Sequence, residues 1–523
     1  MSFDLFTSSV PHPWKGRGTH ALFLLATHVL TALVLGVAGC QYHVDWPECA
    51  TETTSDDTGG TCKAYAIDGA PKPNYFQDIK DGRVTALRFD RDAAGTSDET
   101  VQLLGEHPEW PHFLIILDGV PFDLVEAMYD EGHFRFFAPP ARVVCPFPAM
   151  TDIALSRVFH TKRCVAAEAL YFDRDTDAMS NGNDVYMRGE NAPWITAVTY
   201  SAPQNVAVGT YLNPRSVFSR ELRDMHRLFR ETTELQASAY SVGSAGLGTR
   251  GGEAAIRAYL CEIEKLCERV TYDRAGRVRF TITADHGHGL QRCERVCFQS
   301  YLAEEGFRPR KSLSAPNDVV EISYGLVTYA QFHTNQPEKL ANALARHEAV
   351  ELAMFREGAA VMVLGGEQRA AIRRGDAGYS YEMLQGDPLG LAEIVASLKA
   401  AGHVDAAGNI ADRALFEATS THKYPDPLHR IWCSFDDLVE KPADVIVSLK
   451  PGKCHGSKFF HFFVAPVAST HGSLDYLSSV TFLLTNATPS VLPDIMRSGD
   501  VLNALGWGMI GSTASDDGDA HRE

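Results

Sequence analysis

The sequence predicts an α/β fold built on a mainly parallel sheet with helices on both faces. Short continuous apolar runs such as residues 112–117 are typical of strands buried on both faces. Amphipathic segments lie between such runs, and the strongest, residues 253–270, places its apolar side chains on one side of a helix. Strands that alternate with helices favour parallel pairing. Residues 290–440 contain long polar connections, and we expect a small cap or inserted subdomain there.

The N-terminal segment has the features of an export signal. A basic flank precedes an apolar run at residues 21–39, and Cys40 follows it. The run ends in Val-Ala-Gly-Cys, which resembles a bacterial lipobox. That resemblance implies loss of residues 1–39, lipidation at Cys40, and attachment by a lipid anchor to the outer membrane or cell surface. A plain signal peptide or a single membrane-spanning anchor is the alternative, because the run is close to spanning length.

Polar segments flank the predicted domain. Residues 40–75 contain few apolar side chains, so we expect a lipidated tether without a core. Residues 512–523 have the same character and predict a disordered tail. The domain itself is therefore expected over residues 76–511.

The charge balance restricts the partners. The formal net charge is −18, which argues against a nucleic-acid-binding surface, since such surfaces need clustered Lys and Arg. An anionic substrate remains compatible with this charge, because a bound metal ion supplies local positive charge.

The elements follow one another in a regular order. A helix is expected directly after the strand at 112–117, and a second helix at 148–160 follows a short strand at 142–144. A strand at 278–283 follows the helix at 253–270. Further strands are expected at residues 194–200, 206–210, 359–364 and 443–448.

Three short polar motifs stand where predicted strands end or near the end of the domain. Asp118 with a following glycine ends one strand, Asp285-His286-Gly287 ends another, and Thr470-His471-Gly472 follows a later apolar stretch. Ligands of open α/β sheets bind at the carboxyl ends of the strands. Carboxylates and neutral imidazoles suit zinc or manganese, and glycine lets the backbone pass close to an ion.

This ordered set resembles the alkaline phosphatase superfamily, and most closely its phosphodiesterase and nucleotide pyrophosphatase branch. The resemblance covers residues 111–484 and is strong in three blocks. It implies that Asp118, Asp285 and His286 hold one divalent ion and that His471 belongs to a second. It also implies hydrolysis of a phosphoester, with ions that flank the nucleophile and neutralise phosphoryl charge.

The nucleophile of the family has no direct counterpart. Alignment places Pro146 at a position where the family carries Thr or Ser. Cys145 lies one residue before this position, and Thr151 lies about one turn into the following predicted helix. Thr151 and Cys145 are the candidate nucleophiles, and either would need a shifted backbone. The alternatives are an ordinary helix residue at 151 and a disulfide at 145.

The second ion site also departs from the family pattern. Ala245 and Thr249 occupy the two positions where the family has Asp and His, and neither is a strong ligand. A site with one ion is the natural interpretation, and a site with two ions requires replacement ligands. His288, His455 and His461 are the candidates for that replacement.

The cysteine count suits an exported protein. Of the 11 cysteines, removal of Cys40 leaves ten, an even number that predicts disulfides outside the cytosol. Cys49 with Cys62 and Cys145 with Cys164 are plausible pairs, although connectivity is not readable from sequence.

Two hypotheses of function remain. The first is an extracytoplasmic metal-dependent hydrolase acting on a phosphorylated small molecule, most plausibly a phosphodiester. The second is a degenerate relative that keeps the fold and acts as a binding or surface protein. The intact strand-end motifs favour the first, and the losses at residues 146, 245 and 249 favour the second.

Overall fold

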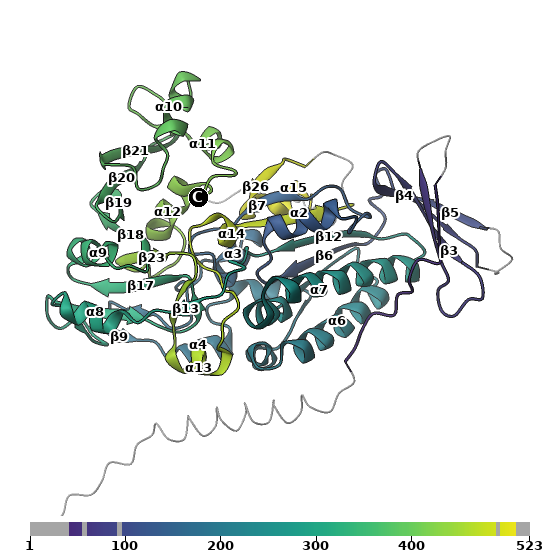
Figure 1. Ribbon diagram of the computed structural model, residues 1–523, viewed down its shortest axis with the longest axis horizontal. Helices are drawn as coiled ribbons and strands as arrows, with labels where there is room; N and C mark the ends of the chain where they lie inside the picture. Colours follow the sequence, from purple (N-terminus) through teal and green to yellow (C-terminus); the bar gives the residue numbers. More distant parts are fainter. Residues whose placement is uncertain (1–40, 55–59, 92–96, 488–491, 509–523) are drawn as a thin grey trace, which may run out of the picture. The chain divides into compact units, whose positions relative to one another are not determined.

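The computed structural model describes residues 41–54, 60–91, 97–487 and 492–508 (Figure 1). The chain divides into two compact units, Met1–Gln41 and Tyr42–Glu523, and every helix and strand below belongs to the second. The predicted signal segment, Cys40 and the predicted tail at 512–523 lie outside the described residues. Within the described part of the chain, no helix has the length and apolar character needed to cross a membrane.

A seven-stranded sheet forms the centre of the α/β architecture. Its strands, in spatial order, are β10 (Tyr200–Ser201), β11 (Gln236–Ser241), β6 (His112–Leu117), β12 (Arg279–Ala284), β25 (Val480–Thr485), β7 (Ala141–Val144) and β26 (Ile495–Arg497). Strands β10, β11, β6 and β12 are parallel, but β25 runs antiparallel to both of its neighbours. The sheet is therefore mixed, and the predicted parallel order holds for one half of it.

Alternation along β6 explains why helices cover both faces of this sheet. Phe113, Ile115 and Leu117 pack in one core with helices α6 (Pro214–Glu231) and α7 (Gly243–Asp273). Leu114 and Ile116 point the other way and pack with α3 (Thr151–Val158). All six residues of β6 are buried, as expected for a strand between two helical layers. Helix α2 (Phe122–Asp130) follows β6 directly, as predicted.

The described part of the segment expected to be a tether is instead folded. An antiparallel sheet contains β1 (Thr51–Thr54), β2 (Thr61–Tyr65), β3 (Tyr75–Lys80), β4 (Arg83–Phe89) and β5 (Glu99–Gln102). Tyr65 and Tyr75 are buried in the same core as β6, and the Tyr75 ring meets Tyr272 of α7 edge to face at 5.5 Å. Polar composition misled the prediction, because the described residues before 76 place few apolar side chains in the core, among them Tyr65, Ile67 and Tyr75.

A second large sheet occupies the region expected for a small cap. Its nine strands, in spatial order, are β14 (Arg308–Pro309), β15 (Asp318–Ile322), β17 (Tyr329–Thr334), β23 (Val445–Leu449), β18 (Val350–Glu357), β19 (Ala360–Gly365), β20 (Gln368–Arg374), β21 (Gly378–Gln385) and β22 (Ile410–Ala411). All pairings except β14 with β15 are antiparallel. Helices α9 (Pro337–Ala345) and α12 (Pro427–Asp436) pack in the separate cores on its two faces (Figure 1). The predicted strands at 359–364 and 443–448 belong to this sheet rather than to a parallel one.

Smaller elements complete the described chain. The short strands are β8 (Phe172–Asp173), β9 (Ala178–Met179), β13 (Glu294–Arg295), β16 (Leu326–Val327) and β24 (Lys453–Gly456). The remaining helices are α4 (Gly182–Arg188), α5 (Gln204–Val208), α8 (Phe298–Glu304), α10 (Ala392–Ala400), α11 (Asp412–Ala418), α13 (Lys458–Val464), α14 (Tyr476–Ser479) and α15 (Val501–Ala504), with 3₁₀ turns η1 (Pro193–Ala197), η2 (Gly209–Tyr211) and η3 (Ser498–Asp500). Predicted strands at 194–200 and 206–210 are wrong, because η1 and α5 occupy most of these segments.

The ten cysteines of the described residues are free thiols. Neither pairing suggested by the sequence forms. The thiol of Cys145 donates to the carbonyl of Ser478 at 3.7 Å, whereas Cys164 lies 3.3 Å from the Ser156 hydroxyl. Cys49 donates to the carbonyl of Thr51 at 3.3 Å rather than meeting Cys62. Burial of thiols among apolar neighbours thus accounts for Cys145 and Cys164 without a bridge.

Candidate metal centre

The structure brings the four strand-end residues together. Asp118 follows β6, and Asp285 with His286 follows β12, the adjacent parallel strand. His471 reaches the same place from the loop before α14. One potential ligand atom from each of Asp118, His286 and His471 lies within 4.8 Å of the others. His286 Nε2 lies 3.4 Å from Asp285 Oδ2 and 3.8 Å from Asp118 Oδ1. Parallel neighbouring strands place their carboxyl ends at one edge, which explains this meeting point.

Each carboxylate is held through one oxygen and leaves the other free. Asp118 Oδ2 accepts a hydrogen bond of 2.5 Å from the Tyr240 hydroxyl. Asp285 Oδ1 accepts the backbone N–H groups of Gly119 at 2.9 Å and of His286 at 2.8 Å. The other oxygens, Asp118 Oδ1 and Asp285 Oδ2, are buried and have no hydrogen-bond partner among the described residues. Buried unpaired carboxylate oxygens are costly, and a bound cation would satisfy both.

The two imidazoles are oriented in the same way. His286 Nδ1 lies 2.8 Å from the carbonyl of Gly287, and His471 Nδ1 lies 2.8 Å from the carbonyl of Ala149. A carbonyl only accepts, so both rings carry the proton on Nδ1 and a lone pair on Nε2. Histidines that bind metal ions are held by this kind of contact through the second ring nitrogen. The rings stack, with centroids 3.8 Å apart and planes inclined by 19°.

Burial dominates the electrostatics of the site. Desolvation raises the pKa of Asp118 well above its usual range, and the neighbouring charge of Asp285 raises it further. Desolvation also raises the pKa of Asp285 to about 7, although hydrogen bonds from the backbone N–H groups of Gly119 and His286 oppose it. Burial lowers the pKa of His286 to about 4, so its imidazole is neutral. The combination of oxygen and neutral nitrogen donors fits a divalent ion, whose charge would stabilise both carboxylates.

Thr151 faces this cluster from the first position of α3. Its Oγ1 lies 3.4 Å from His286 Nε2, and the side chain is only partly buried. The helix begins at Thr151 and not near Pro148, because Met150 is extended and prolines at 146 and 148 keep the preceding backbone out of the helix. The prediction that Thr151 lies a full turn into the helix is therefore wrong, and its hydroxyl stands at the N-terminus of α3.

The thiol of Cys145 is directed away from the cluster. Its thiol donates to the carbonyl of Ser478, and burial raises its pKa to about 12. A thiol with this pKa is a weak nucleophile at neutral pH. Of the two candidates from the sequence, only Thr151 presents its reactive atom to the cluster.

The first two turns of α7 carry Ala245 and Thr249, which stand where the superfamily that the sequence resembles has ligands. Ala245 and Thr249 are buried. Among the described residues, the acidic, histidine and cysteine side chains that converge in a group of three are Asp118, His286 and His471, and none of them lies on α7. Sequence reasoning did not find Tyr240, which orients Asp118 from the end of β11, and gave His288 little weight. His288 lies two residues after His286, so the repeated histidine in Asp-His-Gly-His was the available signal.

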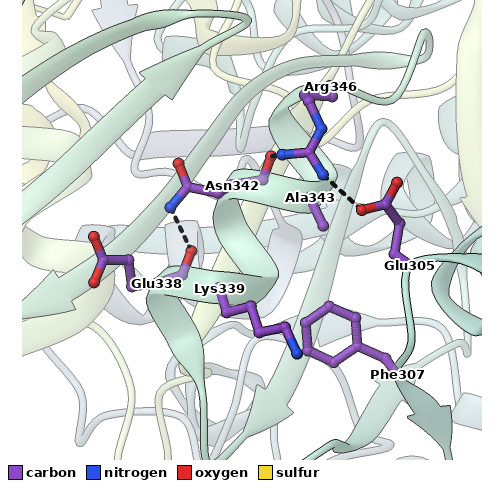
Figure 2. A pocket seen from close by; sticks show the side chains of 7 residues that line it. All are labelled: Glu305, Phe307, Glu338, Lys339, Asn342, Ala343 and Arg346. Atoms are coloured by element: carbon purple, nitrogen blue, oxygen red, sulfur yellow. Dashed lines mark hydrogen bonds and ion pairs between the residues drawn. The ribbon is translucent and has the colours of Figure 1, made fainter.

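A surface hollow elsewhere in the molecule has a different character. Figure 2 shows that α9 and the region after α8 line it with Glu305, Phe307, Glu338, Lys339, Asn342, Ala343 and Arg346. The Arg346 guanidinium pairs with Glu305 at 2.6 Å, and the Lys339 ammonium lies 5.1 Å from the centre of the Phe307 ring. These charges already have partners, so the hollow offers no unsatisfied group to a ligand.

Comparison with known proteins yields distant structural likenesses. No protein-family model and no curated protein matches the sequence. The phosphonoacetate hydrolase of Sinorhizobium meliloti 1021, in complex with phosphonoacetate, is 11% identical, with 78% of this chain and 97% of that chain covered and a TM-score of 0.39. Human ectonucleotide pyrophosphatase/phosphodiesterase 5 is 11% identical, with coverage of 76% and 95% and a TM-score of 0.40. An inactive form of the murine protein in complex with AMP is 11% identical, with coverage of 78% and 97% and a TM-score of 0.40. Scores of this size establish neither a shared fold nor a shared activity.

Proposed function

We propose that this chain is a metal-dependent phosphoester hydrolase of the alkaline phosphatase type, with a phosphodiester as its substrate class. The observation that carries the proposal is the position of Thr151. Its hydroxyl stands at the start of α3, 3.4 Å from His286 Nε2 and beside two carboxylates with free oxygens. A hydroxyl nucleophile, a helix N-terminus and a metal-ligand cluster at one point are the parts that phosphoryl transfer requires.

Some residues of the site would bind the metal ion, and Thr151 would react with the substrate. Asp118, Asp285 and His286 would hold one ion, and His471 lies close enough to contribute. A zinc or manganese ion held by these residues would lower the pKa of the Thr151 hydroxyl and offset charge on the phosphoryl oxygens. Because α3 begins at Thr151, the unpaired backbone N–H groups of its first turn would favour an anion near the Thr151 hydroxyl.

The reaction then follows from Thr151. Its oxygen attacks phosphorus and loses its proton to water, and the bond from phosphorus to the leaving alcohol breaks. The alcohol departs after it takes a proton from solvent, and the phosphoryl group remains on Thr151. A water molecule attacks the same phosphorus opposite the Thr151 oxygen and loses a proton to solvent, while the bond from phosphorus to the Thr151 oxygen breaks and this oxygen takes a proton from solvent. The products are the alcohol and a phosphate monoester, and Thr151 regains its hydroxyl.

We also infer that the protein is exported and held at a membrane by a lipid on Cys40. The support is the basic flank, the apolar run at 21–39 and the Val-Ala-Gly-Cys ending. This places the site in the outer membrane or cell-surface compartment. The limits at 40 and 512 belong to this proposal, whereas a limit at 76 does not, because strands β1 and β2 lie before that residue and β3 crosses it.

The competing proposal is a binding protein without turnover. Ala245 and Thr249 support it, because the family ligands of the second ion are absent there. The orientation of the Thr151 hydroxyl favours the hydrolase, since a protein that only binds has no need of a nucleophile there.

The test uses the full chain with manganese or zinc and two chromogenic substrates, bis(4-nitrophenyl) phosphate and 4-nitrophenyl phosphate. We expect hydrolysis of the diester to exceed that of the monoester. Thr151→Ala should lower kcat by at least about a thousandfold, and Thr151→Ser should retain a measurable part of the rate. Release of nitrophenol by Thr151→Ala at the rate of the unaltered chain would disprove the role of Thr151, and absence of turnover with saturated metal would favour the binding protein.

A further inference from the structure

A third histidine lies beside the metal centre and has no role in the reaction described above. His288 follows Gly287 in the same turn after β12 and is fully buried. Its Nδ1 is hydrogen-bonded to the Ser469 hydroxyl. Its Nε2 has no hydrogen-bond partner among the described residues. A buried imidazole nitrogen without a partner is costly unless a ligand satisfies it.

Two glycines show where this nitrogen points. A Cβ placed on Gly248 would lie 3.1 Å from His288 Nε2, and one placed on Gly119 would lie 2.9 Å from His288 Cδ2. Gly248 belongs to the second turn of α7, between Ala245 and Thr249. His288 Nε2 therefore points toward the turn from which the family ligands of the second ion are missing.

His471 is the neighbour that makes this position useful. The rings of His288 and His471 have centroids 5.8 Å apart and planes inclined by 51°. Two imidazoles that share one ion through bonds of about 2.0–2.1 Å have ring centres about 5–6 Å apart. Both rings have Nδ1 engaged by a protein group, which directs Nε2 inward as in histidine ligands of metals.

We propose that His288 and His471 hold a second divalent ion and so replace the ligands lost at positions 245 and 249. This inference rests on the proposed function, because it assigns the second ion of the same site. With two protein ligands, the remaining coordination positions are open to water and to phosphoryl oxygens of the substrate. The second ion is accordingly bound more weakly than the first, which has two carboxylates.

The experiment measures metal stoichiometry, which does not depend on turnover. The full chain is freed of metal with a chelator and titrated with Co²⁺, using equilibrium dialysis and visible absorption. We expect two ions per chain for the unaltered protein and one for His288→Ala, with the tighter site unchanged. His112→Ala is the matched control, since His112 is buried at the opposite end of β6, where its Nε2 meets the Thr281 hydroxyl at 2.8 Å. It should keep both ions.

Gly248→Ala tests the role of His288 Nε2 while the histidine itself stays in place. The added methyl group would lie 3.1 Å from His288 Nε2 and 3.0 Å from Ile256 Cδ1, so it covers the nitrogen that would bind the ion. Alanine is favoured over glycine in a helix, which argues against a loss of folding. We expect affinity for the second ion to fall by at least about tenfold, as for other changes next to a metal ligand. Binding of the first ion and the far-ultraviolet circular dichroism should stay unchanged, which separates this effect from unfolding.

The outcomes separate the second ion from the proposed hydrolysis. The assignment of His288 would be overturned if the unaltered chain bound a single ion. It would also be overturned if His288→Ala bound two ions with the same affinities as the unaltered chain. Thr151→Ala should bind two Co²⁺ ions while hydrolysis is lost. If Thr151→Ala hydrolyses normally and His288→Ala still loses one ion, the proposed mechanism fails and the second site stands.

Discussion

The metal centre and the hollow at α9 both gather charged side chains, yet they satisfy those charges in opposite ways. At the centre, Asp118 Oδ1 and Asp285 Oδ2 are buried without a hydrogen-bond partner among the described residues. At the hollow, Arg346 and Glu305 are 56% and 31% exposed and form an ion pair of 2.6 Å (Figure 2). A concave surface alone therefore says little about a ligand. Buried polar atoms without hydrogen-bond partners are a stronger indication of a binding site. Their burial destabilises the folded chain unless a ligand satisfies them.

The largest effect should follow from Asp285→Asn. Loss of the negative charge removes a proposed ligand while the neighbouring backbone N–H groups stay in place. We expect affinity for the first ion to fall by more than about a hundredfold, since changes that only support a ligand already cost about 10–100-fold. Competition with a chromophoric chelator measures it, and Glu305→Gln at the hollow is the control. If Asp285→Asn and Glu305→Gln bound the first ion with equal affinity, the metal centre and the hollow would not differ in the way described above.

The sequence located the centre because its ligands carry a local signal. Asp118 and Asp285 each follow an apolar strand, and a glycine one residue after Asp118 and two residues after Asp285 allows the close turn. The position of Thr151 was misjudged, because the start of α3 depends on two prolines rather than on apolar periodicity. Tyr240 gave no signal, since the pairing of β11 with β6 joins residues more than a hundred positions apart.

The pattern of apolar residues also could not predict the direction of the strands. The residues of β25 and β23 are buried throughout, as are those of β6. An apolar run shows burial on both faces but not whether the neighbouring strands are parallel. The sheet before residue 102 was missed for a different reason, because β1 is exposed and its composition resembles a loop.

A smaller effect is expected from Tyr240→Phe. The Tyr240 hydroxyl donates to Asp118 Oδ2 and orients the free oxygen, but it is not itself a proposed ligand. Its loss should weaken the first ion by about 10–100-fold and leave the stoichiometry unchanged. Tyr259→Phe is the matched control, because that buried hydroxyl donates to Ser241 Oγ at 2.8 Å and contacts no proposed ligand. If both variants bind metal equally, Asp118 needs no orientation by Tyr240.

At the hollow we expect little change. A double-mutant cycle with Arg346→Ala and Glu305→Ala should give a coupling energy below about 1 kcal/mol, because the pair is partly exposed and screened by solvent. The coupling should shrink further when salt is raised from about 0.05 to 0.5 M. Diester hydrolysis should stay within about twofold of the unaltered chain, as surface changes away from a site are usually small. A larger loss of hydrolysis would make the hollow part of the functional surface.

The smallest effect concerns His133 and Glu264, a pair that is less exposed than the ion pair at the hollow and more exposed than the residues of the metal centre. His133 Nδ1 lies 2.7 Å from Glu264 Oε2, and this hydrogen bond raises the pKa of His133 above its usual value of 6.5 against the opposing effect of burial. A histidine with a raised folded-state pKa binds its proton more tightly in the folded chain. Its contribution is complete below pH 6.5 and is lost as the pH rises through the raised pKa. Because the imidazole is 35% exposed, solvent screening should hold the contribution below about 1 kcal/mol. Urea unfolding of the full chain and of His133→Gln at pH 5.5 and pH 9 measures it. The difference in midpoint between the two chains should be larger at pH 5.5, and a larger difference at pH 9 would contradict the protonated pair.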